Sequence, residues 1–227
     1  MMLPRHVLGV LAFAFLGNVA NAAAAPISVT YTDPVTGWEW AEVAELKNLF
    51  SWDDVNTVCA EDGVTACAGT LEDKEFDGWI WATSDQVGDL FVNATEGLSA
   101  AMLDDGHAEV FDSPWAPQFL ELFTPTFSFP DHSDWVVGWS ADTEPNVATR
   151  ALTPFMRDVF VSCPPCTIFD ADSATIDAVG DKDSPLLGGV WLHRPAETAV
   201  VTPEPASLLL MGSGLLIGIR RYRKNRS

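Results

Sequence analysis

The acid-rich stretch "DADSATIDAVGDKD" at residues 170–183 has the side chains that calcium prefers. Calcium takes about six to eight oxygen ligands, which carboxylates supply. An EF-hand loop counted from Asp170 would need a ligand at its fifth position and glycine at its sixth, where this stretch has alanine and threonine. Two interpretations remain open, a solvated acidic loop or a looser calcium site formed by Asp170, Asp172 and Asp177.

The four cysteines are an even number, which predicts disulfides in an oxidising compartment. Three pairings are possible, and the most local one joins Cys59 to Cys67 and Cys163 to Cys166. The second pair forms "CPPC", a spacing that redox motifs share when the first cysteine opens a helix and the helix lowers the thiol pKa. Two prolines before the β-prone "TIF" argue against a helix, so we predict a structural loop.

Residues that could serve other catalytic chemistry occur singly, without partners at the spacing of a catalytic motif. Outside the N-terminal segment the histidines are His107, His132 and His193, and the chain has neither H-E-x-x-H nor G-x-S-x-G. We therefore expect no zinc or serine catalysis and no cofactor besides a calcium ion. The alternative function is a secreted hydrolase with two carboxylates about 5–9 Å apart in a cleft. With 32 Asp and Glu, the sequence leaves that alternative open.

Nine tryptophans raise the question of sugar binding, because exposed aromatic faces stack on pyranose rings. Seven of them fall on predicted strands, where tryptophan is usually core. Trp79 and Trp81 are two residues apart, so they project to the same face of a strand. We predict that most of the strand tryptophans are buried.

Charge excludes one class of partner. The chain has 12 Lys and Arg against 32 Asp and Glu, a formal net charge of −20, and five of the basic residues lie in the last eight positions. The remaining chain is therefore strongly acidic and would repel phosphate, so we predict no nucleic-acid binding. A hydrophobic fraction of 48% indicates a folded domain rather than disorder.

Two helices and several strands must position these residues. Capping boxes predict helices that begin after Ser51, paired with Asp54, and after Thr83, paired with Gln86. The first helix would bury Trp52, Val55, Val58 and Cys59 on one face.

Short strands account for most of the remaining pattern. Residues 27–40 predict two strands joined by a turn at Asp33-Pro34, and residues 95–134 predict loops. Further strands are expected at 78–82, 135–141, near 159–162 and at 186–195. The fold class is therefore α+β, a single compact domain of short strands with two short helices.

Both termini have the pattern of targeting segments. Residues 1–22 combine Arg5, an apolar run and Ala20-Asn21-Ala22, which predicts a cleaved secretory signal peptide. Near the C-terminus, the apolar run over 206–219 would span about 21 Å as a helix, short of the hydrocarbon thickness of about 30 Å. The basic residues that follow would hold the end in the cytoplasm. We therefore expect a transient transmembrane helix processed from outside.

The tail resembles a known sorting signal. Pro203-Glu204-Pro205, the apolar run and the cluster with Arg220, Arg221 and Arg223 are similar in order to the PEP-CTERM signal of Gram-negative bacteria. The resemblance implies processing by an exosortase and delivery to the cell surface or an exopolysaccharide matrix.

The body carries a second resemblance. "FDGWIWATSDQVGDLF" and "GGVWLHRP" are similar to a group of PEP-CTERM proteins with the patterns G-W-x-x-A-T-x-x-[EQ]-V-x-x-L-F and G-x-W-L-x-R. Trp-Ala-Glu at 40–42 stands where Trp-Leu-Asp is usual, and His193 is a further departure. The order of these segments also resembles bacterial C-type-lectin-like domains, an analogy at the level of fold alone.

The expected organisation is a signal peptide (1–22), an extracellular α+β domain (23–195), a linker (196–202) and the sorting signal (203–227). The expected function is a non-enzymatic surface or matrix protein that is structural or adhesive. Its expected partners are exosortase, exopolysaccharide and, transiently, the membrane.

Overall fold

The structure is a computed structural model that describes residues 23–103, 107–110, 113–129, 133–161, 169–170, 172–185 and 188–196. The predicted signal peptide, the sorting signal, Cys163 and Cys166 lie outside these residues, and the expected linker is described only at Ala196. Among the described residues, no helix is long and apolar enough to cross a bilayer.

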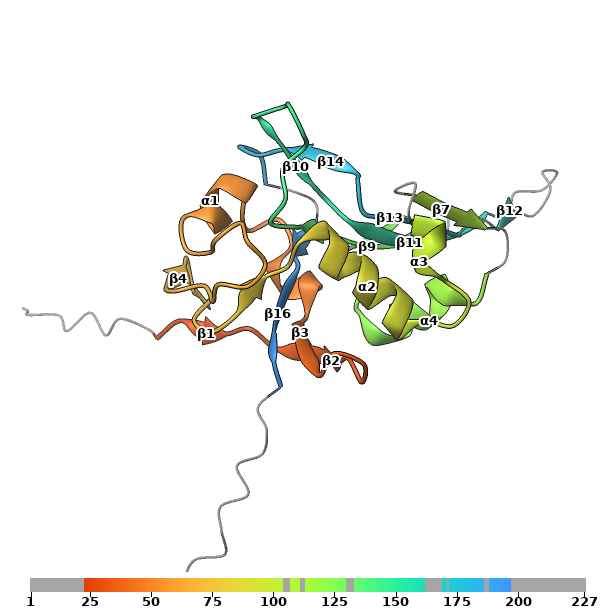
Figure 1. The fold of residues 1–227 in the computed structure, drawn as a ribbon, viewed down its shortest axis with the longest axis horizontal. Helices are drawn as coiled ribbons and strands as arrows, with labels where there is room; N and C mark the ends of the chain where they lie inside the picture. Colours follow the sequence, from red (N-terminus) through yellow and green to blue (C-terminus); the bar gives the residue numbers. More distant parts are fainter. Residues whose placement is uncertain are drawn as a thin grey trace, which may run out of the picture.

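Short strands dominate a mixed α+β fold, as the sequence predicts (Figure 1). The larger sheet has seven strands in the order β15-β9-β11-β13-β7, with β8 on β9 and β12 on β11. Its strands are β7 (His107–Val110), β8 (Phe127–Phe129), β9 (Ser133–Trp139), β11 (Phe155–Val161), β12 (Phe169–Asp170), β13 (Asp172–Thr175) and β15 (Gly189–Val190).

A four-stranded sheet in the order β2-β3-β16-β6 adjoins it. Its strands are β2 (Val29–Thr32), β3 (Trp38–Ala41), β6 (Ile80–Trp81) and β16 (Leu192–Pro195). Two smaller sheets complete the fold, β1-β5-β4 and β10-β14. Their strands are β1 (Ala25–Pro26), β4 (Thr70–Leu71), β5 (Lys74–Glu75), β10 (Arg150–Leu152) and β14 (Val179–Asp181).

The closing segment differs from the single strand predicted over 186–195. Its described part forms β15, which pairs in parallel with β9, and β16, which lies between β3 and β6. Trp191 separates the two strands, so one short segment joins both large sheets. A Cβ atom at Gly188 or Gly189 would lie about 2 Å from the carbonyl oxygen of Val137 or Val43, respectively, so both positions require glycine.

The two predicted helices are present with their capping boxes. They are α1 (Trp52–Asn56), capped by Ser51, and α2 (Ser84–Ala94), capped by Thr83. The first ends before Val58 and Cys59, so the prediction that these residues continue its face is wrong.

The prediction that residues 95–134 are rich in loops is correct only in part, because the stretch also contains α3 (Ala100–Leu103), β7, α4 (Trp115–Leu122) and β8. Prolines on both sides of Ala116 hid α4 in the sequence. Pro117 lies in its first turn, where a helix has no use for an amide hydrogen. A 3-10 turn, η1 (Val43–Leu46), was not predicted either.

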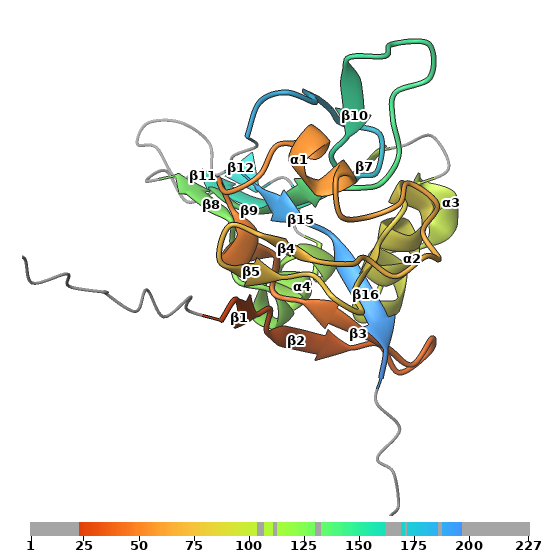
Figure 2. The ribbon, with the colours of Figure 1, turned by 90° about the vertical axis from the view of Figure 1, so that its left-hand side faces the viewer.

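Buried side chains form two hydrophobic clusters. The helical cluster lies among α2, α4, β9, β11 and β13, and it includes Phe91, Trp115, Phe119, Phe123 and Trp191. The disulfide cluster surrounds α1 and the loops that follow it, and it includes Trp52, Cys59, Cys67, Trp79, Trp81 and Trp139. Figures 1 and 2 show β10 at one end of the domain and the end of β16 at the other.

Candidate functional site

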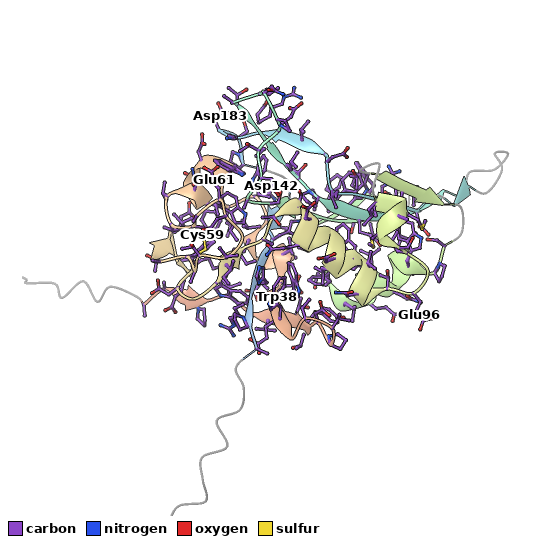
Figure 3. All side chains as sticks on the ribbon, in the orientation of Figure 1. Trp38, Cys59, Glu61, Glu96, Asp142 and Asp183 are labelled. Atoms are coloured by element: carbon purple, nitrogen blue, oxygen red, sulfur yellow. A yellow bond between two sulfur atoms is a disulfide. The ribbon has the colours of Figure 1, made fainter. Side chains whose placement is uncertain are left out.

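A polar cavity of about 490 Å³ lies between α1 and the segment after β14, at the end of the domain opposite the close of β16. Glu61 and Asp183, which help to line it, lie at that end in Figure 3, and Trp38 lies at the other. We call it the Trp52–Lys182 cavity. It is lined by Trp52, Asp53, Asn56, Glu61, Ala148, Thr149, Asp181, Lys182 and Asp183.

The capping box at Ser51 fixes the α1 side of this cavity. Ser51 Oγ accepts a hydrogen bond from the Asp54 amide (3.1 Å), and Asp54 Oδ2 accepts one from the Ser51 amide (2.9 Å). The helix then buries Trp52 and leaves Asp53 and Asn56 exposed. Two polar side chains therefore face solvent beside one buried indole.

Backbone hydrogen bonds tie three distant segments together around the cavity. The Asp53 amide donates to the Lys182 carbonyl (3.2 Å), and the Lys182 amide donates to the Thr149 carbonyl (3.0 Å). The β10–β14 ladder, with Arg150 opposite Asp181, lies beside them. The backbone at Lys182 is thus held by hydrogen bonds to α1 on one side and to the segment before β10 on the other.

The lining of the cavity includes the indole ring of Trp52, and the ammonium of Lys182 lies over that ring. The Lys182 ammonium lies 3.9 Å from the centroid of the Trp52 ring, the geometry of a cation–π contact. The indole is only 1% exposed, and its Nε1 donates to the Ser140 carbonyl (3.0 Å). The ring is therefore anchored in the core at one edge and covered by Lys182 on one face.

Acidic side chains outnumber basic ones around the cavity. Four carboxylates, those of Asp53, Glu61, Asp181 and Asp183, line it together with one lysine. Arg150 Nε lies 3.7 Å from Asp181 Oδ1, but both side chains are about half exposed or more, so this ion pair is weak. The cavity favours cations and hydroxyl donors over anions.

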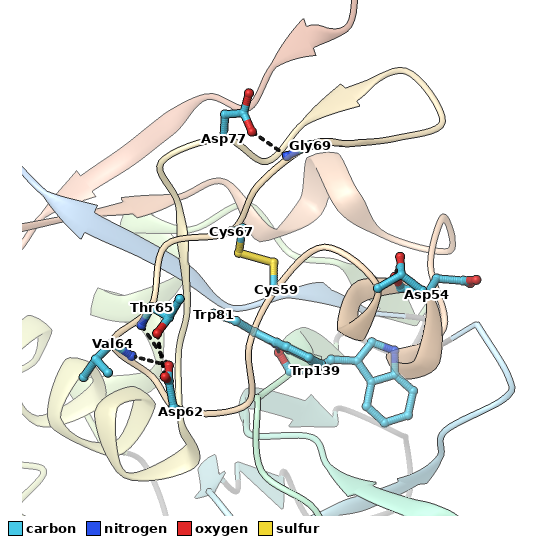
Figure 4. Close-up of a disulfide and its surroundings, with 11 residues drawn as sticks. Asp54, Cys59, Asp62, Val64, Thr65, Cys67, Gly69, Asp77, Trp81 and Trp139 are labelled. Carbon is cyan, nitrogen blue, oxygen red and sulfur yellow. Dashed lines mark hydrogen bonds between the residues drawn. A yellow bond between two sulfur atoms is a disulfide. The ribbon is translucent and has the colours of Figure 1, made fainter.

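The predicted disulfide between Cys59 and Cys67 is present beside this site (Figure 4). Within its loop, Asp62 accepts hydrogen bonds from the side chain and amide of Thr65 and from the Val64 amide, and these bonds lower the pKa of Asp62. Gln86 Nε2 donates to the Gly63 carbonyl (2.9 Å), which connects the loop to α2. The disulfide is structural and holds the loop that carries Glu61.

The structure describes the side chains of two of the three predicted calcium ligands, Asp172 and Asp177. Asp172 begins β13, where its buried Oδ2 accepts hydrogen bonds from the Ser113 amide and hydroxyl. Asp177 lies beyond the other end of that strand, and the side chain of Asp170 is outside the described residues. Within the described part of the chain, no three His, Cys, Asp or Glu side chains could hold a metal ion.

Most tryptophans are core, as the sequence predicts. Seven of them are fully buried, namely Trp40, Trp52, Trp79, Trp81, Trp115, Trp139 and Trp191. Trp38 is partly exposed and stacks on His193 at 4.1 Å, and Trp135 lies against Phe155 and under Arg157. The strand tryptophans therefore provide no uncovered stacking platform among the described residues.

The closing "GGVWLHRP" motif is structural in this fold. Arg194 Nε donates to Glu39 Oε2 (2.9 Å), and its guanidinium lies 4.5 Å from the Trp79 ring centroid. His193 is 1% exposed, and its lost hydration lowers its pKa to about 4. Neither side chain lines the Trp52–Lys182 cavity.

The sequence pattern missed the residues of this cavity. The prediction places candidate ligands at Asp170, Asp172 and Asp177 of the acid-rich stretch, whereas Asp181, Lys182 and Asp183 at its far end line the cavity. The "DKD" triplet and the Trp52-Asp53 pair were the available signals. Only the fold shows that they meet.

Residues 201–224 match the family described as the PEP-CTERM protein-sorting motif. No curated protein and no solved structure matches the chain.

Proposed function

We propose that this chain, which carries a PEP-CTERM sorting motif at residues 201–224, is an exported protein whose domain binds extracellular polysaccharide. The motif implies sorting by an exosortase and export to the cell surface. We further propose that an exosortase processes the tail, that the protein is released to the matrix, and that it acts in adhesion. In this role the domain would bind sugar as a lectin does, with calcium as an optional ligand.

The Trp52–Lys182 cavity is the observation that carries the binding role. Its carboxylates and the Asn56 amide are suited to hydrogen bonds with sugar hydroxyls, and the backbone beneath them is fixed. The cavity and the end of β16 lie at opposite ends of the domain (Figures 1 and 2). A domain tethered by its C-terminus would therefore present the cavity away from the membrane.

A glycan array with the full-length protein, with and without calcium, tests the binding role. We expect bound saccharide that is recovered intact, and loss of binding when Asp181 and Asp183 are both changed to asparagine. Asp89→Asn is the matched control, because Asp89 lines a different cavity. If no glycan binds in either condition, the proposed function is wrong.

The second candidate is a hydrolase, which the four carboxylates around one cavity favour. Cleavage of a bound saccharide that disappears with one Asp→Asn change in the cavity would support this candidate and contradict a purely adhesive role.

Mass spectrometry of the mature C-terminus tests the tail. We expect a mature protein without the basic cluster. An intact Arg226 would contradict exosortase cleavage.

A further inference from the structure

The Trp52–Lys182 cavity already holds one cation, the protein's own lysine. The ammonium of Lys182 lies 3.9 Å from the Trp52 ring centroid, and within the described residues it forms no ion pair. Among the described residues, this ammonium therefore lies against the face of the Trp52 ring. The face of a tryptophan ring attracts ammonium groups.

The side chain of Lys182 can leave this position without a change in the fold. Both of its backbone polar groups are hydrogen-bonded, to Thr149 and to Asp53, so the main chain stays fixed. The side chain itself is partly exposed beside the exposed carboxylates of Asp181 and Asp183. Rotation of this side chain into solvent would uncover the indole face.

We propose that the cavity binds saccharide units that carry a protonated amine, whose ammonium displaces that of Lys182 from the Trp52 ring. Asp53, Asp181 and Asp183 would attract the incoming ammonium. Asn56 Nδ2 donates to Glu61 Oε1 (2.9 Å), and this polar pair would bind neighbouring hydroxyls. This inference rests on the proposed polysaccharide-binding function and names its ligand class.

The negative charge of the cavity should discriminate among three classes of saccharide unit. An amine-bearing unit gains attraction from the carboxylates and from the ring, whereas a neutral acetylated unit gains neither. A uronic acid is repelled by both the cavity and the acidic body of the protein. Because these charges are near the surface, the preference for amines weakens as salt rises.

Calorimetry with two oligosaccharides of equal length tests the inference. The probes are a β-1,4-linked glucosamine hexamer and its fully N-acetylated counterpart, titrated into the full-length protein in detergent at pH 6. We expect the amine form to bind roughly tenfold more tightly in low salt and the difference to shrink in 0.5 M salt. Equal or tighter binding of the acetylated form overturns the amine proposal and leaves polysaccharide binding intact. Absence of binding by either form contradicts both.

Substitution of Lys182 tests displacement directly. Lys182→Met removes the competing cation and keeps a side chain of similar length, so we expect several-fold tighter binding of the glucosamine hexamer. Asp183→Asn should weaken it several-fold. Lys74→Met is the control, because Lys74 pairs with Glu45 away from the cavity. Weaker binding by Lys182→Met overturns displacement, and Lys182→Gln repeats the measurement if the first variant does not fold.

Discussion

The helical cluster and the disulfide cluster bury similar side chains but organise their backbones differently. The helical cluster lies between a long antiparallel sheet and α2 and α4, and its phenyl rings pack in sequence, with Phe91 against Phe119 and Phe119 stacked on Phe123. The disulfide cluster lies mainly among loops, a five-residue helix and short strands, although Trp139 at the end of β9 also belongs to it.

The comparison shows which interactions stabilise a region whose helices and strands are short. Around the disulfide cluster, indole nitrogens donate to backbone carbonyl groups far along the chain, Trp52 to Ser140 and Trp81 to Trp139. Trp191 of the helical cluster does the same to Pro154. The cysteine pair adds a covalent connection, and Lys182 and Arg194 lie over tryptophan rings. Side-chain contacts, to backbone carbonyls, to a second cysteine and to cations, thus supplement the short ladders and the short helix of the disulfide cluster.

The largest expected effect comes from the residue that joins the two clusters. Trp191 is fully buried against Phe91 and Phe123, and its backbone bonds to Trp139 and Ala82. Trp191→Ala should cost about 3–5 kcal/mol of unfolding free energy, with both clusters lost in a single urea transition. Phe129→Ala, at an exposed residue, is the control. Two separate transitions would show that the clusters are independent.

Removal of the disulfide should affect one cluster more than the other. The Cys59→Ser, Cys67→Ser double variant opens a loop with a sequence separation of 8. Chain entropy predicts a loss of about 2–3 kcal/mol. Hydrogen exchange should rise in residues 57–79 and stay low in α4. An equal rise in both regions would contradict the comparison.

The pH dependence of stability should report on His193, at the sheet between the clusters. Its folded pKa of about 4 lies below the usual 6.5, so protons bind more readily to the unfolded chain as the pH falls. Stability is therefore fully present above pH 6.5 and should fall by about 2 kcal/mol between pH 7 and pH 5. His193→Leu should remove this part of the slope in urea unfolding.

The titration of Asp33 does not contribute to the change in stability between pH 7 and pH 5. Burial raises its pKa, but hydrogen bonds from Val35, Thr36 and Asn93 outweigh burial and lower the pKa below its usual value. Its contribution is lost only at lower pH. If wild type and His193→Leu have identical slopes between pH 7 and pH 5, His193 does not carry the effect.

The smallest expected effects come from the two capping boxes, which form a matched pair. Ser51→Ala and Thr83→Ala should each cost about 1 kcal/mol. The first should increase hydrogen exchange near α1, and the second near α2, because each removes one acceptor at its own helix start. Increased exchange in α2 after Ser51→Ala would show that the caps are coupled across the clusters.

Sequence patterns predicted elements whose signals are local. The hairpin at Asp33, both capping boxes, the buried Trp79–Trp81 pair and the Cys59–Cys67 disulfide depend on residues close in the chain, and each is present. Helix α4 was missed because its prolines resemble loop signals, although Pro117 is compatible with a first helical turn.

Features that depend on distant contacts were not predictable in this way. The split of the closing segment at Trp191 depends on β9, β3 and β6, which lie about 50 to 150 residues earlier. The Trp52–Lys182 cavity needs α1 beside β14, which only the tertiary fold supplies. The sorting motif was predicted because its three parts are consecutive.

The position of β16 has a consequence for the timing of export. A chain that crosses a membrane from its N-terminus delivers Leu192–Pro195 after every other strand, yet β16 lies between β3 and β6 and completes their sheet. Until those residues emerge, both neighbours have an unpaired edge. In an export that runs in this direction, the sheet is complete only once the residues just before the sorting motif have emerged.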